Sequence, residues 1–355
     1  MSKKVRIGII GCGNIGGVHI DSYKRISDKV ELVATCDINK ERAQLRQEQY
    51  GFARSYTDYE EMLAKEELDA VSVGTWNNAH ATASIAALEA GVNVLCEKPM
   101  AMNKQEAEAM IAAEKKSGKL LMNGFVRRFG ENTKFSKRLV DSGKIGEIYY
   151  VKTGCIRRIG NPGGWFSDKK RSGGGPLIDL GVHMIDLARY LMGKPKAVSV
   201  MGATYDKLGI RSNIKGIEQW KAMDYSDYNN VEDLAVGFVR FDNGATLVVE
   251  NSWTQHIKED RLYLEIFGTK LGLQMEPTLE IYSEENDYLI NTTPIISKEA
   301  SGFKNNFDRE IEHFVDCIAN GTPCLNTSED GLELMKILDA LYQSAEGKCE
   351  VRIEK

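Results

Sequence analysis

Val5–Gly16 reads VRIGIIGCGNIG, and this stretch decides the fold of the first part of the chain. A run of apolar, β-favouring residues ends at a G-x-G-x-x-G pattern formed by Gly11, Gly13 and Gly16. An amphipathic helix is expected to follow to about Ser27, and then a second strand over 31–36 that ends beside Asp37. Strand, glycine loop, helix, strand and acidic residue in this order predict a βαβ unit that binds a dinucleotide.

The chemistry of a dinucleotide explains this arrangement. Glycines let main-chain N–H groups at a helix N-terminus approach a pyrophosphate. A carboxylate after the second strand, here Asp37, accepts hydrogen bonds from the ribose hydroxyls. The alternative is a glycine turn in another kind of α/β domain. Because Asp37 would repel a ribose phosphate, NAD is favoured over NADP, although Arg42 lies near enough to weaken that preference.

Strand and helix patterns continue to alternate as far as residue 123. We expect strands over 68–73, 92–96 and 120–123, with helices between them that end near residues 90 and 117. Ligand groups gather at the carboxyl ends of parallel strands, so Thr75, Lys98 and Asn123 should lie along one rim of the sheet. Lys98 is the most informative of them, because it is charged and Pro99 restricts its backbone. The alternative is a surface lysine paired with Glu97, which would contribute little to stability.

A second informative stretch is 173–186, which reads GGGPLIDLGVHMID. Apolar residues recur along a helix expected from Pro176, and Asp179, His183, Asp186 and Tyr190 recur at similar spacing on a neighbouring face. The three glycines before the helix would let its backbone approach a ligand closely. His183 is therefore a candidate general base oriented by Asp179. The alternative is a surface helix face with an incidental acid–histidine pair.

Length and composition limit the class of protein. The chain has 355 residues, enough for two domains, and its formal net charge of −5 argues against a nucleic-acid-binding protein. No apolar run approaches the roughly 20 residues that span a membrane. Seven cysteines without a Cys-x-x-Cys pair are typical of reduced thiols in the cytoplasm. The five histidines show no metal-ligand spacing, so no bound metal is expected.

Three features together give a resemblance to a known family. The glycine pattern of residues 11–16, the tripeptide Glu97-Lys98-Pro99 and the stretch 173–186 resemble, in the same order, the Gfo/Idh/MocA oxidoreductases. Smaller similarities are the segments 124–129 and 143–148 and the tripeptide 231–233. The resemblance implies a Rossmann NAD-binding domain over 1–123 and an α+β domain over 124–355. The second domain would hold a large open-faced, mainly antiparallel sheet, one face of which joins subunits of a homo-oligomer (a dimer, tetramer or larger).

The resemblance also assigns roles to individual residues. It implies that Lys98, Asp179 and His183 form the catalytic group, in a site to which both domains contribute, and that Asn123 and Arg127 lie beside the nicotinamide and the substrate. Two departures stand out. Trp76 occupies a position that is often proline in the family, before residues expected near the nicotinamide, and the segment 157–161 does not match inositol dehydrogenases, which weakens myo-inositol as the substrate.

The second domain is expected to be rich in strands. We expect a helix over 132–142, a strand over 145–157, antiparallel strands over 197–203, 234–241, 245–253, 262–267, 279–282 and 288–291, and helices over 305–320 and 328–347. Trp165, in a turn-rich loop before the triple glycine, is a candidate sugar-stacking wall or an anchor of the loop on the core. The polar and aromatic segment 206–230 is a candidate lid over the substrate or an insertion that contacts another subunit.

The expected reaction is reversible oxidation of a secondary hydroxyl on a sugar, glycoside or cyclitol, with hydride passing to NAD. Two alternatives stay open: a redox-neutral enzyme that keeps NAD(H) bound and acts on glycosides through a keto-sugar, and a non-catalytic NAD-binding regulator. The expected substrate-binding residues are Lys98, Arg127, Trp165, Asp179 and His183. The expected cofactor-binding residues are Gly11, Gly13, Asn14, Ile15, Asp37, Arg42, Thr75, Trp76, Asn77, His80, Glu97, Lys98, Asn123 and Arg127.

Overall fold

The computed structural model describes residues 3–297 and 302–353. By its internal contacts the chain divides into two compact units. Unit 1 comprises residues 1–126 and 303–335, and unit 2 comprises residues 127–302 and 336–355. From the sequence a single boundary is expected after residue 123, whereas in the structure the segment 303–335 groups with the N-terminal unit.

Unit 1 is built on a parallel sheet, sheet A, with strand order β3-β2-β1-β4-β5-β6. This is the strand order of a Rossmann fold, so the expected fold of the first domain is confirmed. The strands are β1 (Val5–Ile10), β2 (Val30–Cys36), β3 (Arg54–Tyr56), β4 (Ala70–Val73), β5 (Asn93–Cys96) and β6 (Leu121–Asn123). The helices are α1 (Asn14–Arg25), α2 (Lys40–Tyr50), α3 (Tyr59–Lys65), α4 (Asn77–Glu89), α5 (Lys104–Ser117) and α10 (Phe303–Asn320).

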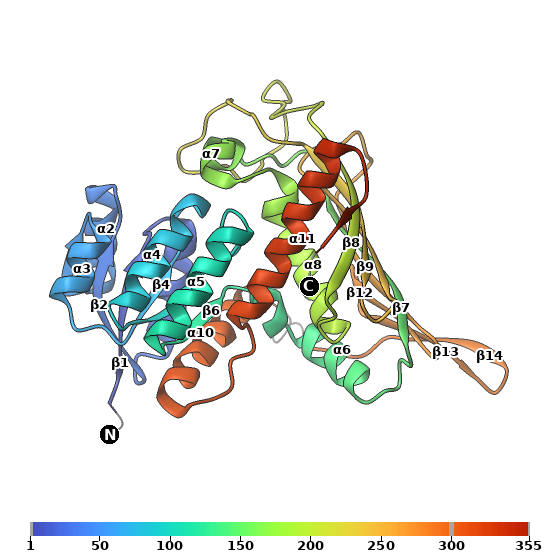
Figure 1. The fold of residues 1–355 in the computed structure, drawn as a ribbon, viewed down its shortest axis with the longest axis horizontal. Coiled ribbons are helices and arrows are strands. Elements are labelled where there is room, and N and C mark those ends of the chain that lie inside the picture. Colours follow the sequence, from blue (N-terminus) through green and yellow to red (C-terminus); the bar gives the residue numbers. More distant parts are fainter. Residues whose placement is uncertain (1–2, 298–301, 354–355) are drawn as a thin grey trace. The chain divides into compact units, whose positions relative to one another are not determined.

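Helix α10, orange-red in Figure 1, comes from the C-terminal part of the chain and packs against α1. Its apolar face buries Ile311, Phe314 and Val315, as expected of an amphipathic helix. Polar contacts flank this face: the Ser22 hydroxyl donates to Asp308 at 2.7 Å, and the Lys29 ammonium donates to Glu312 at 2.7 Å. Segments almost 300 residues apart in the sequence therefore complete one layer of unit 1.

Unit 2 is built on sheet B, with strand order β14-β13-β12-β11-β7-β10-β9-β8-β15. All neighbouring strands are antiparallel except β7 and β10, which confirms the expected α+β class with a mainly antiparallel sheet. The strands are β7 (Ile148–Ile156), β8 (Ala197–Tyr205), β9 (Leu234–Phe241), β10 (Thr246–Ser252), β11 (Arg261–Gly268), β12 (Gly272–Glu276), β13 (Glu280–Glu285), β14 (Tyr288–Thr292) and β15 (Val351–Arg352).

The short helical segments of unit 2 are η1 (Val126–Phe129), which begins at the last residue of the first part of unit 1, η2 (Gly164–Ser167), α7 (Lys169–Ser172) and η3 (Leu177–Gly181). The longer helices are α6 (Glu131–Asp141) and α8 (Val182–Leu191). Helix α11 (Ser328–Gly347) begins in unit 1 and ends in unit 2, with the change after Met335.

The two faces of sheet B differ in burial. On one face Leu341 of α11 packs against Gly202 and Gly237, where an added Cβ would lie 2.5 Å from its side chain at position 237. On the other face Met201 and Phe238 pair directly across β8 and β9 and are 58% and 36% exposed. The sheet is therefore covered by helix on one side and carries apolar side chains in the open on the other. Among the described residues, no helix is both long and apolar enough to cross a membrane.

Candidate active site

The glycine pattern of unit 1 forms a tight turn at the start of α1. Gly11 has φ +95°, a backbone conformation that favours glycine. A Cβ on Gly16 would lie 2.0 Å from the Gly11 carbonyl oxygen, so only glycine lets the helix pack this close to the turn. A Cβ on Gly13 would meet no atom within 4 Å. Gly13 therefore faces open space rather than a neighbouring part of the chain.

The N-terminus of α1 fits a dinucleotide phosphate. Among the described residues no side chain caps this helix, and its first turn, from Asn14, contains no acidic residue. Four backbone N–H groups at a helix start lack partners within the helix, and they carry a partial positive charge. With open space at Gly13, the turn can accept a pyrophosphate, and Asn14 and Ile15 supply the first N–H groups of the helix.

Asp37 lies buried at the end of β2 and is held by backbone donors. Its two carboxylate oxygens accept hydrogen bonds from the Cys12 and Asn39 N–H groups, each at 2.8 Å. The Arg42 guanidinium lies 3.5 Å from the carboxylate. The acid is thus fixed beside the glycine turn, as a ribose-binding carboxylate must be, with a cation near it.

The register of sheet A brings the expected rim residues together. Val73 pairs with Cys96, and Cys96 pairs with Asn123, so β4, β5 and β6 end at the same level. Thr75 and Lys98 each stand two residues beyond these strand ends and are half-buried. The structure therefore places Thr75, Lys98 and Asn123 along one edge, as the sequence predicts.

Buried polar groups support the backbone around Lys98. Glu97 accepts a hydrogen bond from His19 at 3.0 Å, and its other oxygen accepts from the Lys98 N–H at 3.1 Å. Burial by itself would raise the pKa of Glu97, but the hydrogen bond and charge of His19, together with Lys98, hold that pKa below its usual value. His19, on α1, is a supporting residue that the sequence did not suggest.

His80 holds the other side of the same turn. Its Nδ1 lies 2.7 Å from the carbonyl oxygen of Pro99, which follows a cis peptide bond, and its Nε2 lies 3.2 Å from the Thr75 carbonyl. Burial lowers the pKa of His80, and each ring nitrogen lies within hydrogen-bond distance of a backbone carbonyl oxygen. Trp76, half-buried, precedes the first residue of α4, and Asn77 is buried at its start.

In unit 2 the helix that carries Asp179 and His183 is irregular at its start. Residues Leu177–Gly181 form a π-helical turn, η3, before the regular helix α8. From Leu177 to Leu191 every residue is buried except Asp179 and His183, which are half-buried. A π turn inserted in a helix is often found at functional sites. The η3 turn carries Asp179, which is one of the two partly exposed side chains in this otherwise buried segment.

Asp179 is held by a residue far away in the sequence. The indole N–H of Trp253, a fully buried side chain, donates to the Asp179 carboxylate at 3.1 Å. Trp253 belongs to a small core cluster with Leu180 and Val231. The core of unit 2 therefore positions this carboxylate.

The triple glycine packs against the protein itself. A Cβ on Gly174 would lie 2.0 Å from the Tyr342 hydroxyl, and one on Gly175 would lie 2.3 Å from the Glu232 carbonyl oxygen. The buried Glu232 carboxylate accepts hydrogen bonds from the Gly175 N–H at 2.9 Å and from the Tyr342 hydroxyl at 2.8 Å. The sequence predicts that these glycines let the backbone approach a ligand. At positions 174 and 175 the space beside the backbone is instead filled by Tyr342 and Glu232. Glu232 lies in the tripeptide 231–233, whose similarity to the family was the available signal.

Two arginines at the start of unit 2 have acidic partners. Arg128 forms a buried, bidentate ion pair with Asp186, with distances of 3.0 and 2.6 Å. Asp186 therefore secures α8 to the segment before α6. Arg127, an expected substrate and cofactor residue, is half-buried and lies 3.7 Å from Glu276.

The loop that contains Trp165 is covered by the segment 206–230. The Trp165 ring packs on Phe166 with centroids 3.9 Å apart, and Phe166 contacts Trp220 edge-on at 5.5 Å. Asp224 accepts from the Trp165 N–H at 3.3 Å and from the Arg171 guanidinium at 2.9 Å. The long connection therefore lies on the loop that precedes the triple glycine, and Trp165 stays half-buried.

The chain is similar to known proteins over almost its whole length. One family model, an oxidoreductase family with an NAD-binding Rossmann fold, matches residues 5–125, and a second, the GFO/IDH/MocA C-terminal domain, matches residues 134–274. D-glucoside 3-dehydrogenase of Escherichia coli (strain K12) is 35% identical, covering 99% of this chain and 98% of that protein. Myo-inositol 2-dehydrogenase of Thermotoga maritima is 29% identical, covering 99% of both chains.

A solved structure has the same fold as this chain. Levoglucosan dehydrogenase, solved in complex with NADH and L-sorbose, has a TM-score of 0.87 at 24% identity, covering 99% of this chain and 100% of that chain. The expected cofactor, NAD, and the expected class of enzyme, an oxidoreductase, are confirmed. The chain belongs to the Gfo/Idh/MocA family of oxidoreductases.

Proposed function

We propose that the chain oxidises a secondary hydroxyl of a glycoside, with reversible transfer of hydride to NAD. The observation that carries this proposal is the partial exposure of Asp179 and His183 in a segment that is otherwise buried. A histidine beside a fixed carboxylate is suited to take a proton from an alcohol near neutral pH.

Each catalytic residue has one role in the proposal. His183 accepts the proton of the substrate hydroxyl, and Asp179, held by Trp253, stabilises the imidazolium that forms. Lys98 places a positive charge near the developing alkoxide, where exclusion of water strengthens its effect. NAD, held by the glycine turn and Asp37, supplies the hydride acceptor.

The substrate class rests on similarity and on aromatic side chains. The chain is 35% identical to a D-glucoside 3-dehydrogenase and 29% identical to a myo-inositol 2-dehydrogenase, which favours a glycoside over a cyclitol. Trp165 and Trp220, both in contact with Phe166, offer flat apolar surfaces of the kind on which sugar rings stack. Arg127 is proposed to hydrogen-bond a substrate hydroxyl.

The proposal extends to assembly and location. We infer a homo-oligomer formed through the open face of sheet B, because Met201 and Phe238 expose apolar surface there. The seven free cysteines support a cytoplasmic location.

A panel of glycosides, free sugars and cyclitols, assayed by NADH formation and by identification of the product, tests the reaction. We expect turnover on glycosides and a fall of at least about 100-fold for Lys98→Met and His183→Ala, the scale expected for loss of an acid–base or electrostatic group. NADH binding, measured by its fluorescence, should persist in both variants. Lys116→Met and His256→Ala change exposed residues of the same types and should leave turnover unchanged.

The panel also decides between the alternatives. Conversion of a glycoside without net NADH release, by protein that retains its cofactor through gel filtration, would identify the redox-neutral enzyme instead. Full turnover in both Lys98→Met and His183→Ala would refute the assigned roles.

A further inference from the structure

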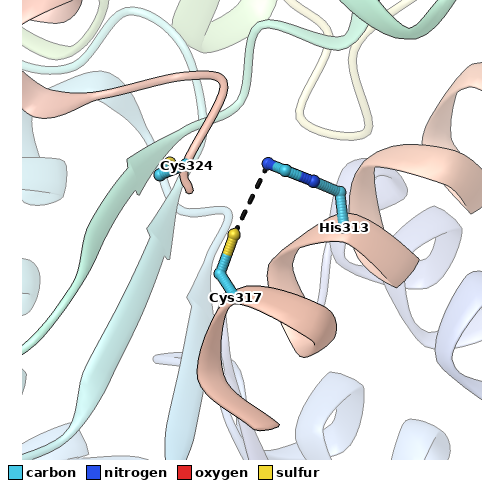
Figure 2. Close-up of side chains that lie close together, drawn as sticks. All are labelled: His313, Cys317 and Cys324. Atoms are coloured by element: carbon cyan, nitrogen blue, oxygen red, sulfur yellow. Dashed lines mark hydrogen bonds between the residues drawn. The ribbon is translucent and has the colours of Figure 1, made fainter. Parts of the chain in front are cut away.

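Three side chains that commonly bind metal ions converge where α10 ends. His313 and Cys317 lie one turn apart on the same face of α10, and Cys324 lies in the loop that leads to α11. One ligand atom from each, the His313 Nε2 and the two sulfur atoms, all lie within 4.8 Å of one another. The Cys317 sulfur is 3.4 Å from the His313 Nε2 (Figure 2). All three residues belong to unit 1.

One sulfur–nitrogen distance in the cluster matches a tetrahedral site. Zinc binds sulfur at about 2.3 Å and histidine nitrogen at about 2.0–2.1 Å, so the sulfur and nitrogen of a tetrahedral site lie roughly 3.5 Å apart. The separation of 3.4 Å between Cys317 and His313 is close to this value. All three side chains are half-buried, so an ion can enter from solvent and keep a water as its fourth ligand.

The surrounding backbone contacts the ligand atoms. The Leu325 N–H donates to the His313 Nε2 at 3.0 Å, so this nitrogen carries the lone pair that a metal ion would need, and the ion would displace the N–H from it. The Asn326 N–H is hydrogen-bonded to the Cys324 sulfur, so one short segment contacts two of the three ligand atoms.

We propose that His313, Cys317 and Cys324 bind one thiophilic divalent cation of the zinc class. Nitrogen and sulfur donors in a tetrahedral arrangement select zinc over magnesium or calcium, which prefer oxygen ligands. Binding forms two metal–sulfur bonds and one metal–nitrogen bond and releases the two thiol protons to solvent. From the sequence no bound metal is expected, because the five histidines show no metal-ligand spacing among themselves.

The cation would secure the loop between α10 and α11. Just after Cys324, Asn326 accepts a hydrogen bond from the Asn123 N–H at 3.0 Å and donates to the Asn123 carbonyl at 3.0 Å. The Thr327 carbonyl accepts from the Asn123 side chain at 2.6 Å. The same short segment thus connects the cluster to Asn123, at the end of β6. This role is structural and is independent of the proposed function.

Titration of the full-length protein with Co²⁺ tests the proposal, with a phosphine reductant keeping the thiols reduced. Thiolate ligation gives a sulfur-to-cobalt charge-transfer band in the near ultraviolet, and tetrahedral geometry gives intense visible bands. We expect one equivalent of Co²⁺ to saturate both bands, Zn²⁺ to displace it, and Zn²⁺ to raise the midpoint of thermal unfolding.

Variants assign the ligands. Cys317→Ser and Cys324→Ser should each lose most of the charge-transfer band and the thermal shift, while Cys349→Ser, at an exposed free cysteine, should keep both. The proposal is overturned if the wild-type protein shows no such band, or if Cys317→Ser/Cys324→Ser retains it. The wild-type titration needs no variant, so poor folding of a variant cannot hide a negative result.

Discussion

Gly13 and Gly16 belong to one motif but differ in what a side chain at each position would meet. A Cβ on Gly13 points into open space, whereas a Cβ on Gly16 would lie 2.0 Å from the Gly11 carbonyl oxygen. We predict that Gly13→Ala folds with unchanged stability but weakens NADH binding at least about tenfold, because its methyl group occupies the phosphate position. Fluorescence titration with NADH and urea unfolding measure the two effects.

Gly16→Ala should act on stability instead, because its methyl group would clash with the protein itself rather than with the cofactor. It is expected to destabilise unit 1 by about 1–3 kcal/mol, because the helix must move away from the turn. Equal loss of stability in both variants would contradict the assignment of Gly13 to the cofactor and Gly16 to packing.

His80 makes stability depend on pH in a defined direction. Burial lowers its pKa in the folded protein, while in the unfolded chain it titrates near 6.5. Below that pH the unfolded state binds more protons than the folded state, so the free energy of unfolding should fall as pH falls from about 6.5. Replacement by His80→Asn should flatten this part of the profile, measured by urea unfolding between pH 5 and pH 8.

His256 offers the matched control, because it is exposed. His256→Asn should keep the wild-type slope below pH 6.5. A wild-type slope in His80→Asn as well would show that other groups cause the dependence.

Individual site residues could be predicted from the sequence where local order decides their position. Asp37, Thr75, Lys98 and Asn123 lie at or just after the carboxyl ends of strands of a parallel sheet, so the strand pattern places them on one rim. The contact between Trp253 and Asp179 joins residues 74 positions apart and depends on how unit 2 packs. The role of His19 was missed for the same reason, and the similarity of residues 231–233 to the family marked Glu232 without showing that it is a buried partner of Gly175 and Tyr342.

At the scale of elements, the segment before η3 allows a test of close packing. Gly175→Ala should be the more damaging change, because its Cβ would meet the Glu232 backbone carbonyl, which cannot rotate away. Gly174→Ala meets the Tyr342 hydroxyl, so Tyr342→Phe should restore part of the stability lost. We expect losses of about 1–3 kcal/mol in urea unfolding. Full additivity of Gly174→Ala and Tyr342→Phe would contradict the contact.

Strong periodicity separates the elements that could be predicted from those that could not. Helix α11 and strand β9 have the expected bounds, and α5 ends where expected, because apolar residues recur at the helical or strand period in each. Helix α2 buries only Ala43, so its sequence carries almost no apolar pattern. The π turn over Leu177–Gly181 has ordinary helical spacing in the sequence, so that pattern does not predict it.

At the scale of the whole molecule, the exposed face of sheet B determines the expected assembly. Met201→Arg places a charge on the apolar face of β8 and should shift the protein toward monomers, since a buried, unpaired charge opposes association. Light scattering after gel filtration measures the mass. Tyr288→Arg, at an exposed position on β14, is the control and should keep the wild-type mass. A wild-type protein that is already monomeric would refute the interface.

The division of the chain into units has a consequence for recombination between related genes. The polypeptide passes from one unit to the other after residues 126, 302 and 335, the last time inside α11. A single crossover after residue 126 would pair α1 with a foreign α10 and replace the partners of Ser22 and Lys29. A chimera that exchanges the cofactor-binding unit must therefore carry residues 303–335 with it. Evolution of new substrate specificity in this architecture is expected to proceed by substitutions within unit 2 rather than by exchange of whole halves.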